Sequence, residues 1–214
     1  QLTADQRSLL ASPFNLVLVS AIADEPDALS FTSDNGLLAS YWDRKRRDCA
    51  ARRQPPPRFA AVIRALANEM SHRQQLTARI SVLDADELAT DAEVMASEHV
   101  VVKDGQRYAF FHESFFDYAF ARLWLDLDQS LVEFLLADEQ ELFRRAQVKQ
   151  ILLHIRDDDP ERFIREAEAV LAHPKIRFHI KAVVLAVLRS LADPTGAEWQ
   201  MIQRLMAMGG PLVD

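Results

Sequence analysis

The sequence predicts a mainly α-helical fold that contains a single β-hairpin. Apolar side chains recur at helical spacing through most of the 214 residues, of which only five are glycine, a residue that is costly inside helices. One stretch, residues 99–111, changes to the two-residue period of β-strands. Three helices followed by one hairpin form the outline of a winged helix.

The composition limits the possible partners and location of the chain. The net charge is −7, which argues against a general nucleic-acid binder, because such proteins neutralise phosphates with cations. Cys49 is the only cysteine, so no internal disulfide can form, and we expect a reducing, cytoplasmic location. No apolar run reaches the roughly 20 residues that span a bilayer, so we expect no membrane partner. The first ten residues carry Asp5 and Arg7 and do not form a signal peptide.

Capping signals place the first three helices. Thr3 to Gln6 reads as a capping box, and the helix it opens should end near Ala11, since a proline disfavours a helical residue before it. Pro13 suits the first position of a second helix, over residues 14–23. A third helix, residues 34–53, is expected to bury one stripe, namely Leu37, Leu38, Tyr41, Trp42 and Lys45.

The proline run at 54–57 predicts a boundary, because such a run is stiff and extended. Residues 59–70 follow as a helix. Asp84 to Glu87 is expected to cap a further helix. Residues 90–97 are expected to form one more helix. Asp104-Gly105 is a strong hairpin signal between two β-rich runs.

From Glu113 onward the whole pattern is helical. Asp159-Pro160 reads as an N-cap with proline at the first helical position, and residues 176–191 form a further amphipathic helix. Thr195 to Glu198 caps another. Successive helices with short connections are typical of a helical-repeat array.

Three segments, in this order along the chain, resemble one protein family. Residues 12–22 and 34–47 resemble the two lid helices of NACHT and related STAND nucleotide-binding proteins. Residues 100–121 resemble the end of the family's winged helix, in which an aromatic residue stands two before a histidine that Ser-Phe follows. Here those positions are Phe110, His112, Ser114 and Phe115, then Asp117, Tyr118 and Ala121. Asp117 replaces the usual glutamate and Phe116 a common glutamine.

The resemblance covers about residues 9–126 and implies three parts. These are a lid-type helical subdomain (1–53), a winged-helix domain (56–126) and a helical arm of HEAT-like repeats (127–214). The family's ATPase core precedes the lid, but no G-x-x-x-x-G-K-[ST] motif and no strand ending in paired acids occurs here. We therefore expect a non-catalytic segment of a longer ATPase, as a start at Gln1 in place of methionine also indicates.

By resemblance, His112 reaches the phosphates of ADP, and Pro13 and Phe14 lie against the adenine. An imidazole can donate a hydrogen bond to a phosphate oxygen, and the adjacent helix start adds a positive dipole end. The alternatives are a histidine that caps the hairpin-to-helix corner, a plain first-turn proline and a core aromatic. ADP or ATP with Mg is expected in the longer protein, and no cofactor on this chain alone.

The other chemistry-bearing residues favour structural roles. The aromatics after His112 are expected in the core, and the basic run Arg44–Arg47, with Arg52 and Arg53, on a solvated helix face. His173, His179 and Cys49 make no credible metal set. Asp157 to Asp159 reads as a charged helix junction.

The sequence thus predicts a regulatory switch. ADP would hold lid and winged helix against the ATPase core, and exchange for ATP would permit self-association; the family often serves in antiviral or innate-immune-like defence. One alternative is a winged-helix DNA-binding regulator with a helical partner domain, although its candidate recognition segment (84–98) is acidic. Another is a structural helical-repeat adaptor.

Overall fold

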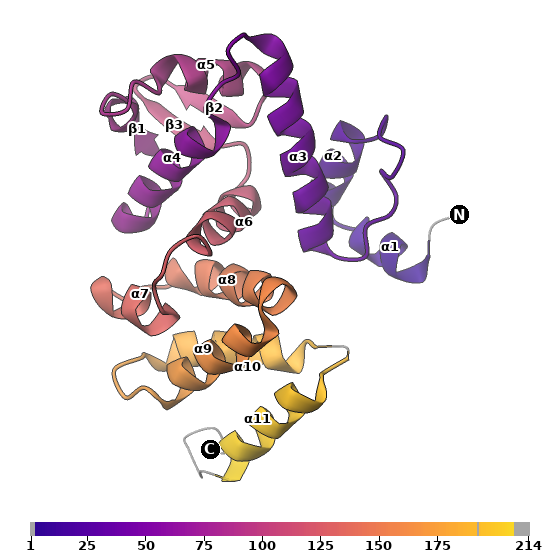
Figure 1. Cartoon of the computed structure of the whole chain (residues 1–214), viewed down its shortest axis with the longest axis vertical. Coiled ribbons are helices and arrows are strands. Elements are labelled where there is room, and N and C mark those ends of the chain that lie inside the picture. Colours follow the sequence, from indigo (N-terminus) through magenta and orange to yellow (C-terminus); the bar gives the residue numbers. More distant parts are fainter. Residues whose placement is uncertain (1–2, 192, 208–214) are drawn as a thin grey trace. The chain divides into compact units, whose positions relative to one another are not determined.

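The computed structural model describes residues 3–191 and 193–207 of the chain. The fold is mainly α-helical with one small antiparallel sheet, as predicted (Figure 1). The chain divides into two compact units, one ending at Ala119 and the other beginning at Phe120. Within the described ranges, no helix has both the length and the apolar composition needed to cross a membrane.

The first unit begins with three helices whose starts follow the sequence signals. They are α1 (Ala4–Leu9), α2 (Pro13–Ala21) and α3 (Asp34–Arg52). Thr3 and Gln6 form the predicted capping box, in which the Gln6 N–H donates to Thr3 Oγ1 (3.2 Å) and the Thr3 N–H to Gln6 Oε1 (2.9 Å). Pro13 occupies the first turn of α2.

The buried stripe of α3 differs from the prediction at one position. Leu37, Leu38, Tyr41 and Trp42 are buried, but Cys49 completes the stripe and Lys45 does not. The Lys45 ammonium lies over the Tyr41 ring, 5.8 Å from its centre, so that the stem packs while the charge stays at the surface. Burial raises the pKa of the Cys49 thiol to about 12, which keeps it neutral and unreactive.

The rest of the first unit has the connectivity of a winged helix. Its elements are α4 (Phe59–Arg73), β1 (Ala78–Arg79), the 3₁₀ helix η1 (Ile80–Leu83), α5 (Ala89–Ser97), β2 (Val101–Asp104) and β3 (Arg107–Phe110). The strand order is β1-β3-β2, and both pairings are antiparallel. Tyr108 is central, since it pairs with Ala78 on one side and Lys103 on the other. Strand β1 was not predicted, because two residues are too few for a periodic pattern.

The hairpin forms one residue later than its strongest signal suggested. Asp104 still pairs with Arg107, so the two turn residues are Gly105 and Gln106. Gly105 has a φ of +53°, and Gln106 is not among the residues with positive φ. That combination fits a type II′ turn, which requires glycine at its first central position.

The predicted helix capped by Asp84 to Glu87 is wrong. Asp84 instead ends η1, and the four residues form turns, with Glu87 at a φ of +54°. The Leu88 N–H donates to the Leu83 carbonyl (2.8 Å), and both leucines are buried. Arg58 donates to the carbonyls of Asp86 (2.9 Å) and Glu87 (2.7 Å), so tertiary contacts satisfy backbone groups that a helix would have used.

Arg58 also helps to fix the proline run that separates α3 from α4. Arg53 and Arg58 flank this run, and both donate to the carboxylate of Asp91 on α5, Arg58 at 2.7 Å. The Asp91 side chain is only 2% exposed. Both ends of the predicted boundary are therefore held to one buried carboxylate.

Helix α6 (Glu113–Trp124) contains the boundary between the two units, and five helices follow it among the residues that the structure describes. They are α7 (Leu131–Ala137), α8 (Arg144–Asp158), α9 (Pro160–Ala172), α10 (Phe178–Arg189) and α11 (Gly196–Ala207). In the second unit α8, α9 and α10 pack against one another, while α7 and α11 each pack on α9. Asp159 is the N-cap of α9, and its carboxylate accepts from the Arg162 N–H (2.9 Å), as predicted.

Two buried carboxylates fix the ends of helices in the second unit. Glu198 accepts from Arg156 of α8 (2.5 Å) and from the Thr195 N–H (2.7 Å), which completes the predicted cap of α11. Glu166 of α9 accepts from the Leu131 N–H at the start of α7 (2.8 Å). Buried carboxylates need such partners, because an unpaired charge in the core is costly.

We predict that Asp91 makes the stability of the chain depend on pH. Its burial raises its pKa, but the hydrogen bonds from Arg58 and Arg53 outweigh burial and leave the pKa below its ordinary value. This stabilisation is complete above the unfolded-state pKa of about 4 and is lost as the pH falls through the lower folded-state pKa. Asp91→Asn should lower the free energy of unfolding by about 1–3 kcal/mol at neutral pH and flatten its decline below about pH 4.

Urea unfolding between neutral pH and pH ~3 measures this effect. Glu161→Gln is the matched control, since the Glu161 side chain is 90% exposed and its ion pair is long, at 3.9 Å. An acid decline as steep in Asp91→Asn as in the wild type would refute the role of Asp91.

Candidate functional site

His112 stands at the corner where β3 ends and α6 begins, and the backbone holds its ring. The imidazole Nδ1 accepts a hydrogen bond from the Ser114 N–H (3.1 Å), and the His112 carbonyl accepts from the Phe116 N–H (3.2 Å). His112 therefore caps α6, as the structural alternative from the sequence proposed. Because Nδ1 accepts, the proton of the neutral ring lies on Nε2, which donates to no other group in the described part of the chain.

Phe14 of α2 packs directly on this histidine. The two ring centres are 3.9 Å apart and the planes are inclined by 21°. Pro13, the residue before it, is exposed at the first turn of α2, whereas Phe14 and His112 are half-buried. The structure thus brings Phe14 and His112 together from segments far apart along the chain, and Pro13 precedes Phe14 in the first turn of α2.

The start of α2 adds a positive helix end beside the stacked rings. Its N-cap, Ser12, makes no side-chain capping bond, and no acidic residue lies in the first turn. The backbone N–H groups of such a turn carry the positive end of the helix dipole and favour an anion. The stack therefore places the imidazole of His112 near a helix start that has no side-chain cap.

A continuous set of aromatic contacts holds this corner in place. Phe115, which is fully buried, lies 5.1 Å from Phe111, 5.3 Å from Tyr41 and 6.2 Å from Trp42, measured between ring centres. Phe111 in turn contacts Tyr41 (5.0 Å) and Phe14 (6.0 Å). These rings connect α2 and α3 to the strand and helix that flank His112.

The aromatics that follow His112 are core residues, as expected. Five aromatic residues of α6 are buried, namely Phe115, Phe116, Tyr118, Phe120 and Trp124, and Leu123 is buried with them. Within the second unit, Phe120 and Trp124 both contact Phe134, at 5.6 and 6.1 Å.

Sequence reasoning missed Asn15, which fixes the position of α2. This side chain is only 5% exposed. Its Nδ2 donates to the Leu9 carbonyl (2.8 Å) and to Asp34 Oδ1 at the start of α3 (2.7 Å). A polar residue within an apolar helical run was the available signal, because a buried amide needs partners.

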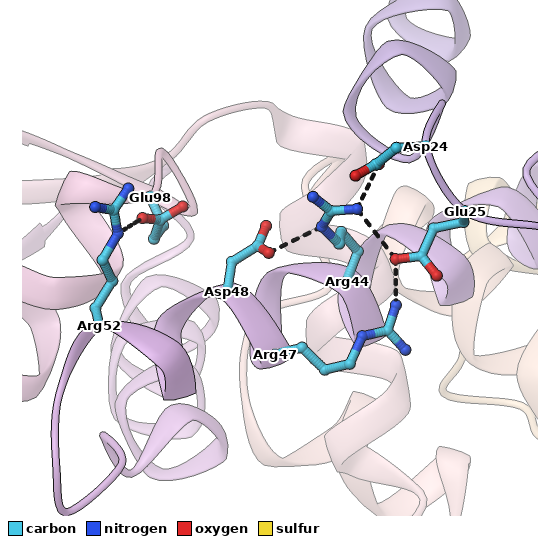
Figure 2. Close-up of polar contacts among 7 residues, drawn as sticks. All are labelled: Asp24, Glu25, Arg44, Arg47, Asp48, Arg52 and Glu98. Atoms are coloured by element: carbon cyan, nitrogen blue, oxygen red, sulfur yellow. Dashed lines mark hydrogen bonds and ion pairs between the residues drawn. The ribbon is translucent and has the colours of Figure 1, made fainter.

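The basic run of α3 is occupied by carboxylates of the same unit. Arg44 binds Asp24 (2.5 Å), Glu25 (3.1 Å) and Asp48 (2.8 Å), and Arg47 binds Glu25 (2.6 Å), as Figure 2 shows. The Arg44–Asp48 pair is the helical pair that the sequence predicted. These contacts tie the loop after α2 to the middle of α3.

The remaining arginines of this run are also paired. Arg46 binds Asp43 (3.6 Å). Arg52 binds Glu98 at the end of α5 (Figure 2). The run was expected to be a solvated helix face, but most of its charges form ion pairs that connect α3 to neighbouring segments. Such cations offer little free charge to a phosphate backbone.

The other candidate residues form no metal site. Among the described residues, no group of three or more histidine, cysteine, aspartate or glutamate side chains could hold a metal ion. His173 has its own structural role, because its Nδ1 accepts from the Lys175 N–H (3.2 Å).

No protein-family model matches this chain, and no curated protein matches it.

We predict that Phe115→Ala lowers the free energy of unfolding by about 3–5 kcal/mol, because it empties the centre of the aromatic cluster. Phe178→Ala is the control, since Phe178 is 71% exposed and its loss should change stability by under about 0.5 kcal/mol. Urea unfolding of both variants measures the difference. Similar losses in the two variants would contradict the central position of Phe115.

Proposed function

We propose that this chain is the regulatory, non-catalytic part of a STAND-type signalling ATPase, where it contacts bound nucleotide and controls switching and self-association. The observation that carries this proposal is the stack of Phe14 on His112, with ring centres 3.9 Å apart. Two segments that separately resemble the family meet at this contact.

The chemistry of the corner suits a nucleotide phosphate. The Ser114 N–H occupies Nδ1 of His112 and leaves the Nε2–H as a donor toward a phosphate oxygen. The uncapped start of α2 lies beside it and favours negative charge. Pro13 is exposed and Phe14 half-buried, so both keep apolar surface for an adenine.

Hydrolysis is assigned to an ATPase core outside this chain, which would supply the phosphate cradle and the Mg²⁺ ligands. ADP would hold α2, α3 and the winged helix against that core, and exchange for ATP would release them. A nucleotide can bias such an equilibrium only if its contacts differ between the two states. We expect release to permit self-association, in a cytoplasmic and defence-related role.

The test is ADP binding by the longer protein, measured by calorimetry. His112→Ser keeps a side-chain acceptor that can cap α6 but removes the Nε2 donor. We predict that it weakens ADP binding by about 1–3 kcal/mol, the range of a hydrogen bond to a charged group. It should also raise the fraction of oligomer without ligand.

His173→Ser is the matched control, because His173 also accepts a backbone N–H two residues ahead of it but lies in the second unit. Its ADP affinity should equal that of the wild type. Unchanged ADP affinity and unchanged assembly in His112→Ser would show that His112 only caps α6 and does not contact nucleotide.

The strand order of the first unit favours a second candidate, a winged-helix DNA-binding regulator. The exposed residues of α5 are Thr90, Glu93 and Ser97, which include no cation for DNA phosphates. Lys103, on the wing, is already bound to Glu93 (2.5 Å).

We predict no shift of duplex DNA by this chain in a mobility assay at low ionic strength. Removal of the acidic group in Glu93→Gln should not create one. A complex that dissociates as salt increases would favour the DNA-binding alternative, since phosphate contacts release counterions.

A further inference from the structure

A groove lies between α8 and α10 in the second unit, away from the residues assigned to nucleotide. Its volume is about 370 Å³. It is lined by Arg145, Ala146, Lys149, Ala182, Val183, Ala186, Val187 and Ser190. The wall from α10 is apolar along two helical turns, while α8 contributes two cations and one alanine.

The groove has the dimensions of a helix contact. The lining residues from α10 and its C-cap extend from Ala182 to Ser190, which corresponds to about 12 Å at 1.5 Å per residue. Alanines on both walls, Ala146 and Ala186 among them, leave room for side chains of a bound helix to enter between α8 and α10. Amphipathic helices bind such apolar grooves through side chains at i, i+3, i+4 and i+7.

The charge on the rim distinguishes this groove from the other basic surfaces. Arg145 and Lys149 are exposed, one helical turn apart on α8, and neither side chain has an ion pair within the described ranges. The arginines of α3, by contrast, bind carboxylates of their own unit. In a chain of net charge −7, two unpaired cations beside an apolar floor attract an acidic partner.

We propose that this groove binds an acidic amphipathic helix of a partner protein. Two carboxylates spaced i, i+4 on that helix pair with Arg145 and Lys149, which have the same spacing. The apolar side chains of the helix lie along Ala182, Ala186 and Val187. This role is independent of the nucleotide contact at His112.

Two other classes of partner fit the groove less well. A nucleic-acid backbone would use the two cations but has no apolar side chains for the floor. An anionic membrane surface requires a broader cluster of cations, and the overall negative charge of the chain opposes it.

The probe is a fluorescein-labelled synthetic helix with i, i+4 glutamate pairs beside a leucine stripe at i, i+3 and i+7, titrated with the 214-residue chain. Fluorescence anisotropy should show saturable binding that weakens as salt increases. The double variant Arg145→Glu/Lys149→Glu should bind about tenfold more weakly. Ala186→Trp, which fills the groove, should abolish binding.

The matched control is Arg7→Glu/Arg79→Glu, which changes the same net charge on two exposed arginines of the first unit. It should bind like the wild type, and circular dichroism should show that all variants are folded. A shuffled peptide of the same composition separates groove binding from general charge attraction. Equal binding of the shuffled peptide, retained binding in the charge-reversed or groove-filled variant, or no saturable binding would each overturn the proposal.

Discussion

The aromatic contacts around Phe115 are the interaction on which the first unit depends. This one buried ring touches rings from α3 and from the segment that joins β3 to α6. Through Phe111 the same contacts extend to Phe14 on α2. Aromatic pairs stabilise a fold beyond their buried area and have preferred geometries, so these contacts help to hold α2 against the corner through Phe14. His112, at the edge of the cluster, is held by packing on one side and by the Ser114 N–H on the other.

Ion pairs complete the same arrangement at its periphery. Asp91 holds both ends of the proline run through Arg53 and Arg58, and Arg44 holds the loop that follows α2. Most of these arginines are partly exposed, so each pair contributes modestly to stability. Their larger effect is on which partners the unit can bind. The arginines that could have formed a basic surface are paired with carboxylates of the same unit. In the second unit, Arg145 and Lys149 remain available to a partner.

Much of the fold was predictable because its signals are local. Capping residues such as Thr3 and Asp159 and the apolar spacing of α4 each act within a few neighbouring residues. The segment after Asp84 was not predictable, because Arg58 and the Leu83–Leu88 contact decide its conformation from a distance. Strand β1 exists only through its pairing with β3. At the site, the importance of His112, Pro13 and Phe14 came from the family resemblance, and neither spacing nor composition indicated that Phe14 would stack on His112.

A double-mutant cycle on Phe14→Leu and His112→Ser tests most directly whether α2 and the corner form one site. The unfolding free energy of this chain is measured for both single variants and for the double variant. If the stacked rings hold α2 in place, the two changes should couple by about 0.5–1.5 kcal/mol, the value of an aromatic pair. Additive effects would mean that Phe14 and His112 contribute separately, and would contradict the single site from which the nucleotide-contacting role is inferred.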